Sequence, residues 1–473
     1  MLFPDASFDL LPDWPSVPAE TLMSAFQALG FEPRACRDKL EQLIPALQLD
    51  PAWFDLDAIA AGGRTATDQL LFGIFDGQSE GKWRWQMHST LRRSFTLPLK
   101  PEEVEVAGEI LRLGTHGEYV DEFRDECESA LGDTLASWIW PSTLTELPHG
   151  QHGLWPGIDG PGIYRREHAS LVLRSRTTTL VTDPQGYNRA WTTNGGRFPQ
   201  ESAPLPMDGV LLTHSHGDHW HLPSILRMVS SNEVPVIVPH VPRPSILCPE
   251  NMAESLRLVG QRAVDPAWWQ TVEIGDFVID VLPFYGEQPL RRRSGVAADA
   301  RNWGNCYRFT CPEFSAAILV DSGVDPQGNM IDVLERSVAE RGPLDVLLSC
   351  CFSFPEGYNP GLPIYFLTVP LEHLRHFYLH PEDRGSMTLG TAGLVNACRA
   401  ARCRYFLPYA HGFQGLFRSP RSVEGGRQAE EEALTAIKDG LGETSTQLLS
   451  WHPGDVARIE GGELTLVRGA RPA

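Results

Sequence analysis

The stretch that decides the fold is THSHGDHWH, residues 213–221. It follows a short apolar run, Val-Leu-Leu, which predicts a buried strand that ends in a loop. His214 and His216 are two residues apart, so a strand end or a tight loop can aim both imidazoles at one point. Asp218 and His219 then supply an oxygen and a nitrogen that suit a second metal close to the first. The stretch therefore predicts a site for two metals.

The alternative is a polar, histidine-rich surface loop. Histidine is scarce in this chain, with 15 in 473 residues, yet four of them fall within eight positions directly after an apolar strand. This clustering favours the metal site. The motif resembles the first metal motif of the metallo-β-lactamase superfamily, His-x-His-x-Asp-His, and matches it at every position. His221 lies outside the motif, so we expect it to support the ligands or the fold rather than to bind metal.

Composition restricts the class of protein. A chain of 473 residues is too long for one ordinary core, so two domains are expected. The net charge of −20 argues against nucleic acid as a partner, because binding phosphates needs a basic face. We find neither a secretion signal nor an apolar run of the ~20 residues that a membrane span needs, and we expect a cytoplasmic protein. The nine scattered cysteines indicate reduced, buried thiols.

The chain divides into two predicted domains. Residues 1–147 show helical spacing of leucines and phenylalanines, ended at Gly30, and we see no cluster of ligands there. This mixed, helix-containing domain is expected to serve dimerisation, giving a homodimer, or recognition of a partner or carrier; a structural cap is the alternative. A Gly/Pro-rich linker follows, and residues 148–473 form the metal domain. Within it, the resemblance implies the αββα sandwich of an α/β metallo-β-lactamase fold.

The resemblance implies further ligands at the ends of later strands. The superfamily usually has a histidine after the strand that we predict at 277–282, but this chain has Glu287 in that place, since His240 comes one strand too early. Asp321 directly follows a buried strand and fits the bridging carboxylate, although it could instead cap the next element. His411 matches the last ligand of the superfamily. Three other histidines share one face of a helix that looks solvated, namely His373, His376 and His380.

The ligands sort into two metal positions. One takes His214, His216 and Glu287; the other takes Asp218, His219 and His411; Asp321 bridges them. A glutamate in place of a histidine makes the site harder and more anionic, which favours iron or manganese over zinc. This shifts the expected chemistry from hydrolysis towards oxidation.

The residues around Glu287 narrow the resemblance to one group within the superfamily. The run PFYGEQP at 283–289, together with a large N-terminal domain, looks like the di-iron oxygenases built on this fold, typified by the amino acid β-hydroxylases of the chloramphenicol pathway. That family implies a monooxygenase of antibiotic biosynthesis that hydroxylates an amino acid held as an aminoacyl thioester on a carrier domain of a nonribosomal peptide synthetase. It also implies two iron ions, O2 as co-substrate and an external electron donor. Glu287 and Asp321 are then the residues on which catalysis depends most.

Other readings stay open. The first is a dizinc hydrolase of an ester, lactone, thioester or phosphodiester, which uses the same ligands without a reductant. The second is a docking or scaffold protein whose metal serves folding, although such a site is ordinarily closed around one metal. Arg291 begins a run of three arginines that could meet a phosphopantetheine phosphate or lie in a solvated loop. Tyr285, Trp303 and Phe413 could line a substrate pocket or simply pack in the core.

Overall fold

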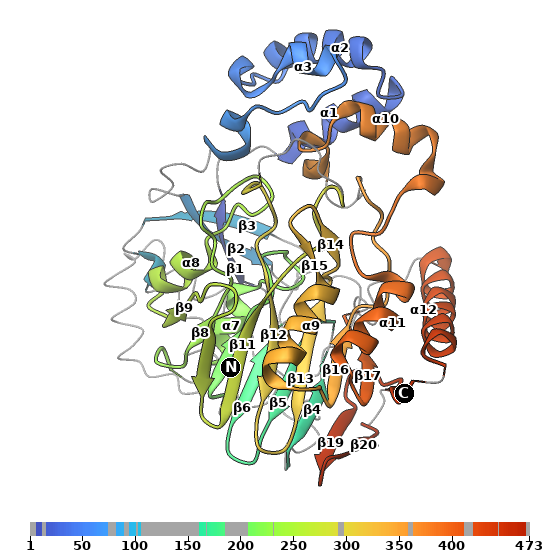
Figure 1. Ribbon diagram of the computed structural model, residues 1–473. Coiled ribbons are helices and arrows are strands. Elements are labelled where there is room, and N and C mark those ends of the chain that lie inside the picture. Colours follow the sequence, from blue (N-terminus) through green and yellow to red (C-terminus); the bar gives the residue numbers. More distant parts are fainter. Residues whose placement is uncertain are drawn as a thin grey trace.

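Two β-sheets form the centre of the protein, with helices on either side (Figure 1). A computed structural model of the protein describes residues 6–11, 16–73, 82–88, 94–100, 103–105, 160–166, 168–184, 207–229, 231–291, 298–357, 363–410, 420–442 and 444–469. The predicted domain boundary at 147 and the linker up to residue 159 lie outside these ranges, so the boundary stays a prediction.

The first sheet has seven strands and runs from antiparallel to parallel. In spatial order it contains β10 (Thr271–Ile274), β11 (Phe277–Pro283), β12 (Asn305–Thr310), β13 (Ser315–Val320), β16 (Val346–Ser349), β17 (Tyr405–Pro408) and β18 (Gln447–Leu448). β10 to β13 pair in antiparallel fashion, whereas β13, β16, β17 and β18 are parallel. Helices must therefore cross over between the parallel strands.

The second sheet has eight strands. In order they are β20 (Glu463–Val467), β19 (Val456–Glu460), β4 (Gly162–Arg165), β5 (Leu171–Arg174), β6 (Thr179–Thr182), β7 (Gly209–Leu211), β8 (Val236–Ile237) and β9 (Ala263–Val264). The C-terminal hairpin of β19 and β20 joins this sheet beside β4, although nearly 300 residues separate them in sequence. The sequence predicts that the metal domain opens with strands at 169–173 and 177–181, which the structure shows as β5 and β6; the strand β4 before them was not expected.

The main hydrophobic core lies between the two sheets. Along β11, Phe277, Ile279 and Val281 are fully buried, while Val278 and Asp280 between them are only partly buried. This alternation is what a strand with one face towards a core requires. Leucines of β5 and β6 belong to the same buried cluster. The eight cysteines of the described residues are also buried and free of disulfides.

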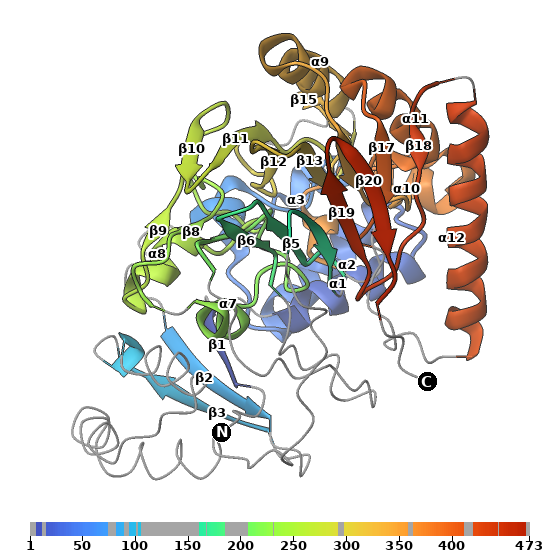
Figure 2. The ribbon, with the colours of Figure 1, turned by 90° about the horizontal axis from the view of Figure 1, so that it is seen from below.

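Helices complete the αββα sandwich. α9 (Met330–Arg341), α11 (Gly390–Ala401) and α12 (Pro420–Leu441) lie together on the outer side of the first sheet, and α7 (Leu222–Met228) and α8 (Met252–Leu258) lie on the side of the second (Figure 2). Several of these helices begin at side-chain caps. His221, for example, accepts from the Ser224 amide at the start of α7, so it has the structural role expected of it. None of the helices in the described part of the chain has the length and apolar character needed to cross a bilayer.

A helical region precedes the sandwich. It contains α1 (Ser16–Ala28), α2 (Pro33–Ala46) and α3 (Leu56–Ala60), with short turns at η1 (Pro51–Trp53) and η2 (Gln69–Gly73). The predicted helix that stops at Gly30 is confirmed as α1. A three-stranded sheet, β1 (Ala6–Leu11), β2 (Lys82–His88) and β3 (Ser94–Leu99), makes this region mixed, as expected.

The N-terminal helices share a hydrophobic cluster with a late segment of the chain. That segment comprises η4 (Pro363–Leu367), α10 (Leu371–Leu379) and η5 (Pro381–Asp383) and lies beside the N-terminal helices in Figure 1. The rings of Phe26 in α1 and Phe366 in η4 meet edge to face, with centroids 5.8 Å apart. The helices therefore support η4, which also reaches the candidate site.

Candidate metal centre

The first metal motif forms a tight turn after β7. The amides of His219 and Trp220 both donate to the carbonyl of His216, at 2.8 and 2.7 Å. This turn folds the chain back so that His214, His216, Asp218 and His219 contribute to three overlapping groups of candidate ligands. The turn thus brings the four residues of the motif into one region of the structure.

The first group consists of His214, His216 and Glu287. Nε2 of His214 lies 3.1 Å from Nδ1 of His216 and 3.2 Å from Oε2 of Glu287. Nδ1 of His216 lies 3.1 Å from Oε1 of the same carboxylate. Two imidazole nitrogens and a carboxylate thus converge at the spacing of ligands around one metal. The structure brings together all three residues that the sequence assigned to the first position.

The backbone holds Glu287 in an unusual conformation. Glu287 has φ = 50°, and Gly286 before it has φ = 92°. A Cβ at position 286 would lie 2.3 Å from the Gly323 amide nitrogen and 2.4 Å from the Met387 carbonyl oxygen, so only glycine fits there. The Glu287 amide donates to the same Met387 carbonyl at 3.1 Å. A left-handed glutamate costs free energy and persists where its surroundings dictate it, which is common at functional sites.

A central group joins His214, His219 and Asp321. Asp321 directly follows β13, where the pairing register with β16 shifts between Ile318 and Val320. Such an irregularity can re-aim a side chain at the end of a strand. Oδ2 of Asp321 lies 3.1 Å from Nε2 of His219, and Oδ1 is buried without a hydrogen-bond partner among the described residues. A bridging carboxylate offers one oxygen to each metal. Oδ2 of Asp321 lies beside a ligand of the second position, and Oδ1 is available for the other metal.

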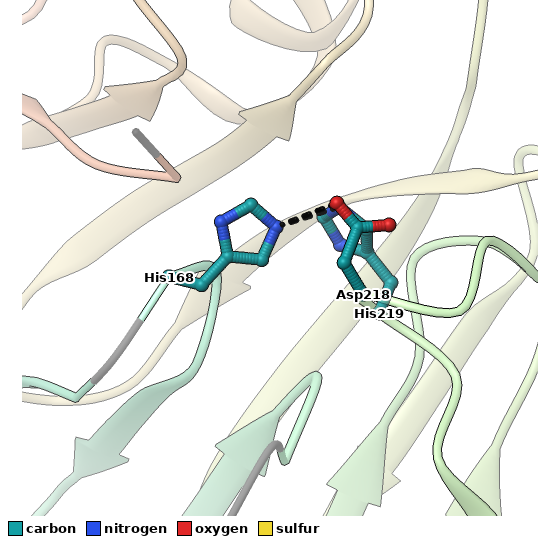
Figure 3. Close-up of side chains that lie close together, drawn as sticks. All are labelled: His168, Asp218 and His219. Carbon is teal, nitrogen blue, oxygen red and sulfur yellow. Dashed lines mark hydrogen bonds and ion pairs between the residues drawn. The ribbon is translucent and has the colours of Figure 1, made fainter. Parts of the chain in front are cut away.

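The second group contains His168, Asp218 and His219 (Figure 3). Nε2 of His168 lies 3.1 Å from Oδ2 of Asp218 and 3.3 Å from Nε2 of His219. His168 comes from the loop between β4 and β5, and the sequence reasoning did not select it. The available signal was a histidine directly before the predicted strand at 169–173, in a chain with few histidines.

Asp183, which Thr213 in turn holds in place, orients His219. Its Nδ1 lies 2.9 Å from Oδ2 of Asp183, a fully buried carboxylate after β6. Asp183 also accepts from the amide of Thr213 at 2.8 Å and from its hydroxyl at 2.6 Å. A carboxylate that receives the outer N–H of a histidine fixes the tautomer in which the inner nitrogen is free for metal.

A different pair of residues surrounds His216. The hydroxyl of Tyr365 in η4 lies 3.0 Å from Nε2 of His216. Nδ2 of Asn302 lies 3.4 Å from the same nitrogen and donates to Oε2 of Glu287 at 3.2 Å. The sequence offered no signal for either residue, because neither follows a predicted strand.

Burial and close charges shift the protonation of the site. Burial, together with the neighbouring imidazoles of His219 and His216, lowers the pKa of His214 well below its ordinary value, so its lone pair is available. Burial also raises the pKa of Glu287. Against the effect of burial, Asp218 raises the pKa of His219 well above its ordinary value, and His219 in turn lowers the pKa of Asp218. In the absence of metal, ion pairing thus balances the charges of the second group.

The remaining predicted residues contribute less to the described site. His411 and Phe413 lie outside the described residues, so the role of His411 stays a prediction. His373, His376 and His380 are half exposed on or beside α10, as expected for a solvated helix face.

The aromatic residues and the arginine run were possible lining or docking residues. Tyr285 and Trp303 pack with Trp268 around the guanidinium of Arg301. Arg291 is exposed, and its amide donates to Glu356; the rest of the run lies outside the described residues.

The donor set fits a centre of two metals. Four imidazoles and three carboxylates of the described residues take part: His168, His214, His216, His219, Asp218, Glu287 and Asp321. The central group shares His214 with the first group and His219 with the second. The two candidate metal positions therefore lie side by side. Buried carboxylates are stable when they are paired or bind a cation, and Asp321 keeps one oxygen without a partner among these residues.

Comparisons with known proteins support the fold. Residues 185–315 match the model of a β-lactamase superfamily domain. No curated protein sequence matches the chain.

Among solved structures, CmlA, a diiron β-hydroxylase from Streptomyces venezuelae, is similar with a TM-score of 0.54 and 15% identity over 95% of this chain and 98% of that one. A variant of CmlA gives a TM-score of 0.53 and 16% identity over 83% and 70% of the two chains. An isothiocyanate hydrolase from Delia radicum gut bacteria gives a TM-score of 0.38 and 13% identity over 62% of this chain and 97% of its own. The chain therefore has the metallo-β-lactamase fold, preceded by an N-terminal region, in an arrangement similar to that of CmlA.

Proposed function

We propose that this protein is a di-iron, O2-dependent oxygenase. The observation that carries the proposal is the carboxylate of Glu287 within 3.2 Å of His214 and 3.1 Å of His216. A carboxylate in place of a third imidazole makes this position harder and more anionic, which favours iron over zinc. The fold of CmlA, described as a diiron β-hydroxylase, supports the same choice.

The reaction proposed is hydroxylation of the β-carbon of an amino acid. O2, two protons and two electrons from an external donor convert a C–H bond to C–OH and release one water, and the irons, when bound, would supply the redox chemistry. The protein's own residues hold the metals, keep the imidazoles in the required tautomers and exclude bulk water. His214 is fully buried and Glu287 is 5% exposed, so this part of the site is well shielded from solvent.

The proposed substrate is an aminoacyl thioester on a carrier domain of a nonribosomal peptide synthetase, in the biosynthesis of an antibiotic or related natural product. This part rests on the resemblance at the ligand motifs and on the N-terminal region. Its helices contact η4, which carries Tyr365 to His216, so docking of a carrier or a second subunit on these helices would lie close to the centre.

A second candidate is a dizinc hydrolase of an ester, lactone, thioester or phosphodiester. The observation in its favour is the second group, where His168 and His219 give two nitrogens beside one carboxylate oxygen. Two histidines and one carboxylate are also a ligand set of catalytic zinc sites, and zinc held there would activate water for attack on a carbonyl or phosphorus.

Metal content and visible absorption of freshly purified protein separate the two candidates. About two irons per chain, with a colour change when O2 meets the chemically reduced protein, is the result expected of a di-iron oxygenase. Carrier-bound amino acids are then the substrates to test, against the same amino acids free in solution. Two zincs per chain, with no response to reductant or O2 and with hydrolysis of an ester or lactone, would overturn the oxygenase proposal.

A further inference from the structure

We propose that His168 is a direct ligand of the second metal position. This goes beyond the ligand set that the superfamily motifs supply, and it rests on the metal-binding part of the proposed function only. The imidazole of His168 points at the carboxylate of Asp218, with His219 directly behind (Figure 3). His168 is 5% exposed and His219 1%, so both imidazoles are buried, and only Asp218 of the three residues reaches the surface.

The three candidate donor atoms have the spacing of a coordination site. Nε2 of His168, Oδ2 of Asp218 and Nε2 of His219 are separated by 3.1, 3.3 and 3.9 Å. A triangle with sides of 3.1, 3.3 and 3.9 Å has a circumradius of about 2.0 Å, which is close to ordinary metal–nitrogen and metal–oxygen distances. One metal ion can therefore touch all three atoms without a large movement of any side chain.

The orientation of His219 agrees with this role. Its Nδ1 is already engaged by Asp183 at 2.9 Å, so its Nε2 is the atom that faces His168. Two imidazoles whose Nε2 atoms lie 3.3 Å apart can share at most one hydrogen, while both also approach one carboxylate oxygen. A cation between the three atoms satisfies all of them together.

The backbone fixes His168 at the tip of a short loop. The residue has φ = 51°, which is uncommon for any side chain except in tight turns or at functional sites. The Arg166 amide donates to the Ser170 carbonyl at 2.9 Å across the loop, and the His168 carbonyl accepts from Ala410 at 3.1 Å.

Nearby contacts anchor the same loop to the first sheet. The buried guanidinium of Arg165, at the end of β4, donates to the carbonyls of Pro408 and Trp451, at 3.1 and 2.6 Å. The loop that carries His168 is thus tied to the end of β17, so the imidazole is pre-positioned rather than free to swing away.

The simpler account is an ion pair in which His168 only donates to Asp218. The variant His168→Gln separates the two accounts. A glutamine amide nitrogen falls close to the position of Nε2 and can still donate to Asp218, but it does not supply an imidazole lone pair. An ion-pair role is therefore largely kept in the glutamine variant, whereas a ligand role is lost.

The test is titration of metal-free protein with Co2+ in competition with a chelator, followed by visible absorption. We expect the wild type to bind two equivalents. In His168→Gln, the first equivalent binds as in the wild type and the second at least about 100-fold more weakly, since even residues behind the ligands contribute 10–100-fold. In His168→Ala, added imidazole should restore the second equivalent and its absorption. His240→Gln, an exposed histidine paired with Asp265, is the matched control and should leave both equivalents unchanged.

Equal affinity for the second Co2+ in the wild type and His168→Gln would overturn the inference, as would a wild type that holds only one equivalent. Thermal unfolding of the metal-free variants shows whether a loss of binding follows from misfolding, and imidazole rescue distinguishes a missing ligand from a damaged fold. Occupancy by Co2+ does not depend on the reaction catalysed. Failure of the oxygenase proposal, seen as zinc content without a response to O2, is therefore a separate result.

Discussion

The first group, His214, His216 and Glu287, is enclosed, whereas the second group reaches the surface through Asp218. The side chains of His214, Glu287 and His216 are 0%, 7% and 16% exposed, while that of Asp218 is 46% exposed. The first group is supported by Tyr365 and Asn302, and the second by the buried carboxylate of Asp183. The first group thus lies largely buried beside η4, the segment that contacts the N-terminal helices. The second group is accessible to solvent at Asp218.

This difference in exposure suggests that the two metal positions have different roles. An enclosed position with a glutamate keeps a metal in a fixed, anionic environment, which suits redox chemistry. The more open position is the one through which solvent or a small co-substrate can approach. Because Asp321 lies between them, a change at that residue should affect both halves, and changes elsewhere should affect one.

The largest effect is expected for Asp321→Asn. The amide cannot bridge two cations, and its nitrogen would face Nε2 of His219, where Oδ2 now lies 3.1 Å away. We expect both metals to bind more than about 100-fold more weakly, and turnover to fall to background. Metal analysis after dialysis against a chelator measures this. Retention of both metals would show that the two halves are independent of Asp321.

Glu287→His should change the first group alone. Histidine tolerates a positive φ better than most residues, so it can occupy this position. We expect the protein to keep two metals, to prefer zinc over iron, and to lose O2-dependent activity. Metal selectivity in an equimolar iron and zinc mixture measures the change. Glu287→Gln is the control of similar shape, and unchanged activity in the histidine variant would remove the main support for an oxygenase.

The ligands of the first group were predicted from the sequence more completely than those of the second, and the reason is physical. His214, His216, Glu287 and Asp321 each follow a strand whose apolar run is visible in the sequence, and the structure has strands at those places. His168 was missed because β4 before it was missed. This strand has only four residues, and it is held by pairing with β19, far away in the chain.

The supporting residues could not be predicted from local sequence either. Asp183 was not selected from the sequence, and its carboxylate is directed inwards to Thr213 and His219. Tyr365 lies in a short 3-10 turn without a clear apolar period, and its position depends on packing against α1. Motifs at strand ends are local signals, whereas residues that orient ligands are set by tertiary contacts.

Asp183→Asn should weaken the second group and spare the first. The asparagine oxygen can still accept from Thr213, but its NH2 group would meet the N–H of His219 that the carboxylate now accepts. We expect about 100-fold weaker binding of the second metal and a loss of about 1–3 kcal/mol in the free energy of unfolding. Chelator competition and denaturant unfolding measure the two effects. Equal weakening of both metals would show that Asp183 supports the motif as a whole.

The smallest effect is expected for Tyr365→Phe, which tests whether the Tyr365 hydroxyl supports His216 in the first group. When His216 binds metal through Nδ1, its Nε2 carries a hydrogen and donates to the Tyr365 hydroxyl 3.0 Å away. Phenylalanine keeps the packing of η4 against α1 but leaves that hydrogen without this acceptor. We expect the first metal to bind about 10-fold more weakly and the second to bind normally. His376→Gln, on the half-exposed face of α10, is the matched control and should change neither. Weakening of the second metal instead would mean that η4 supports the open half, and the assignment of Tyr365 to the first group would be wrong.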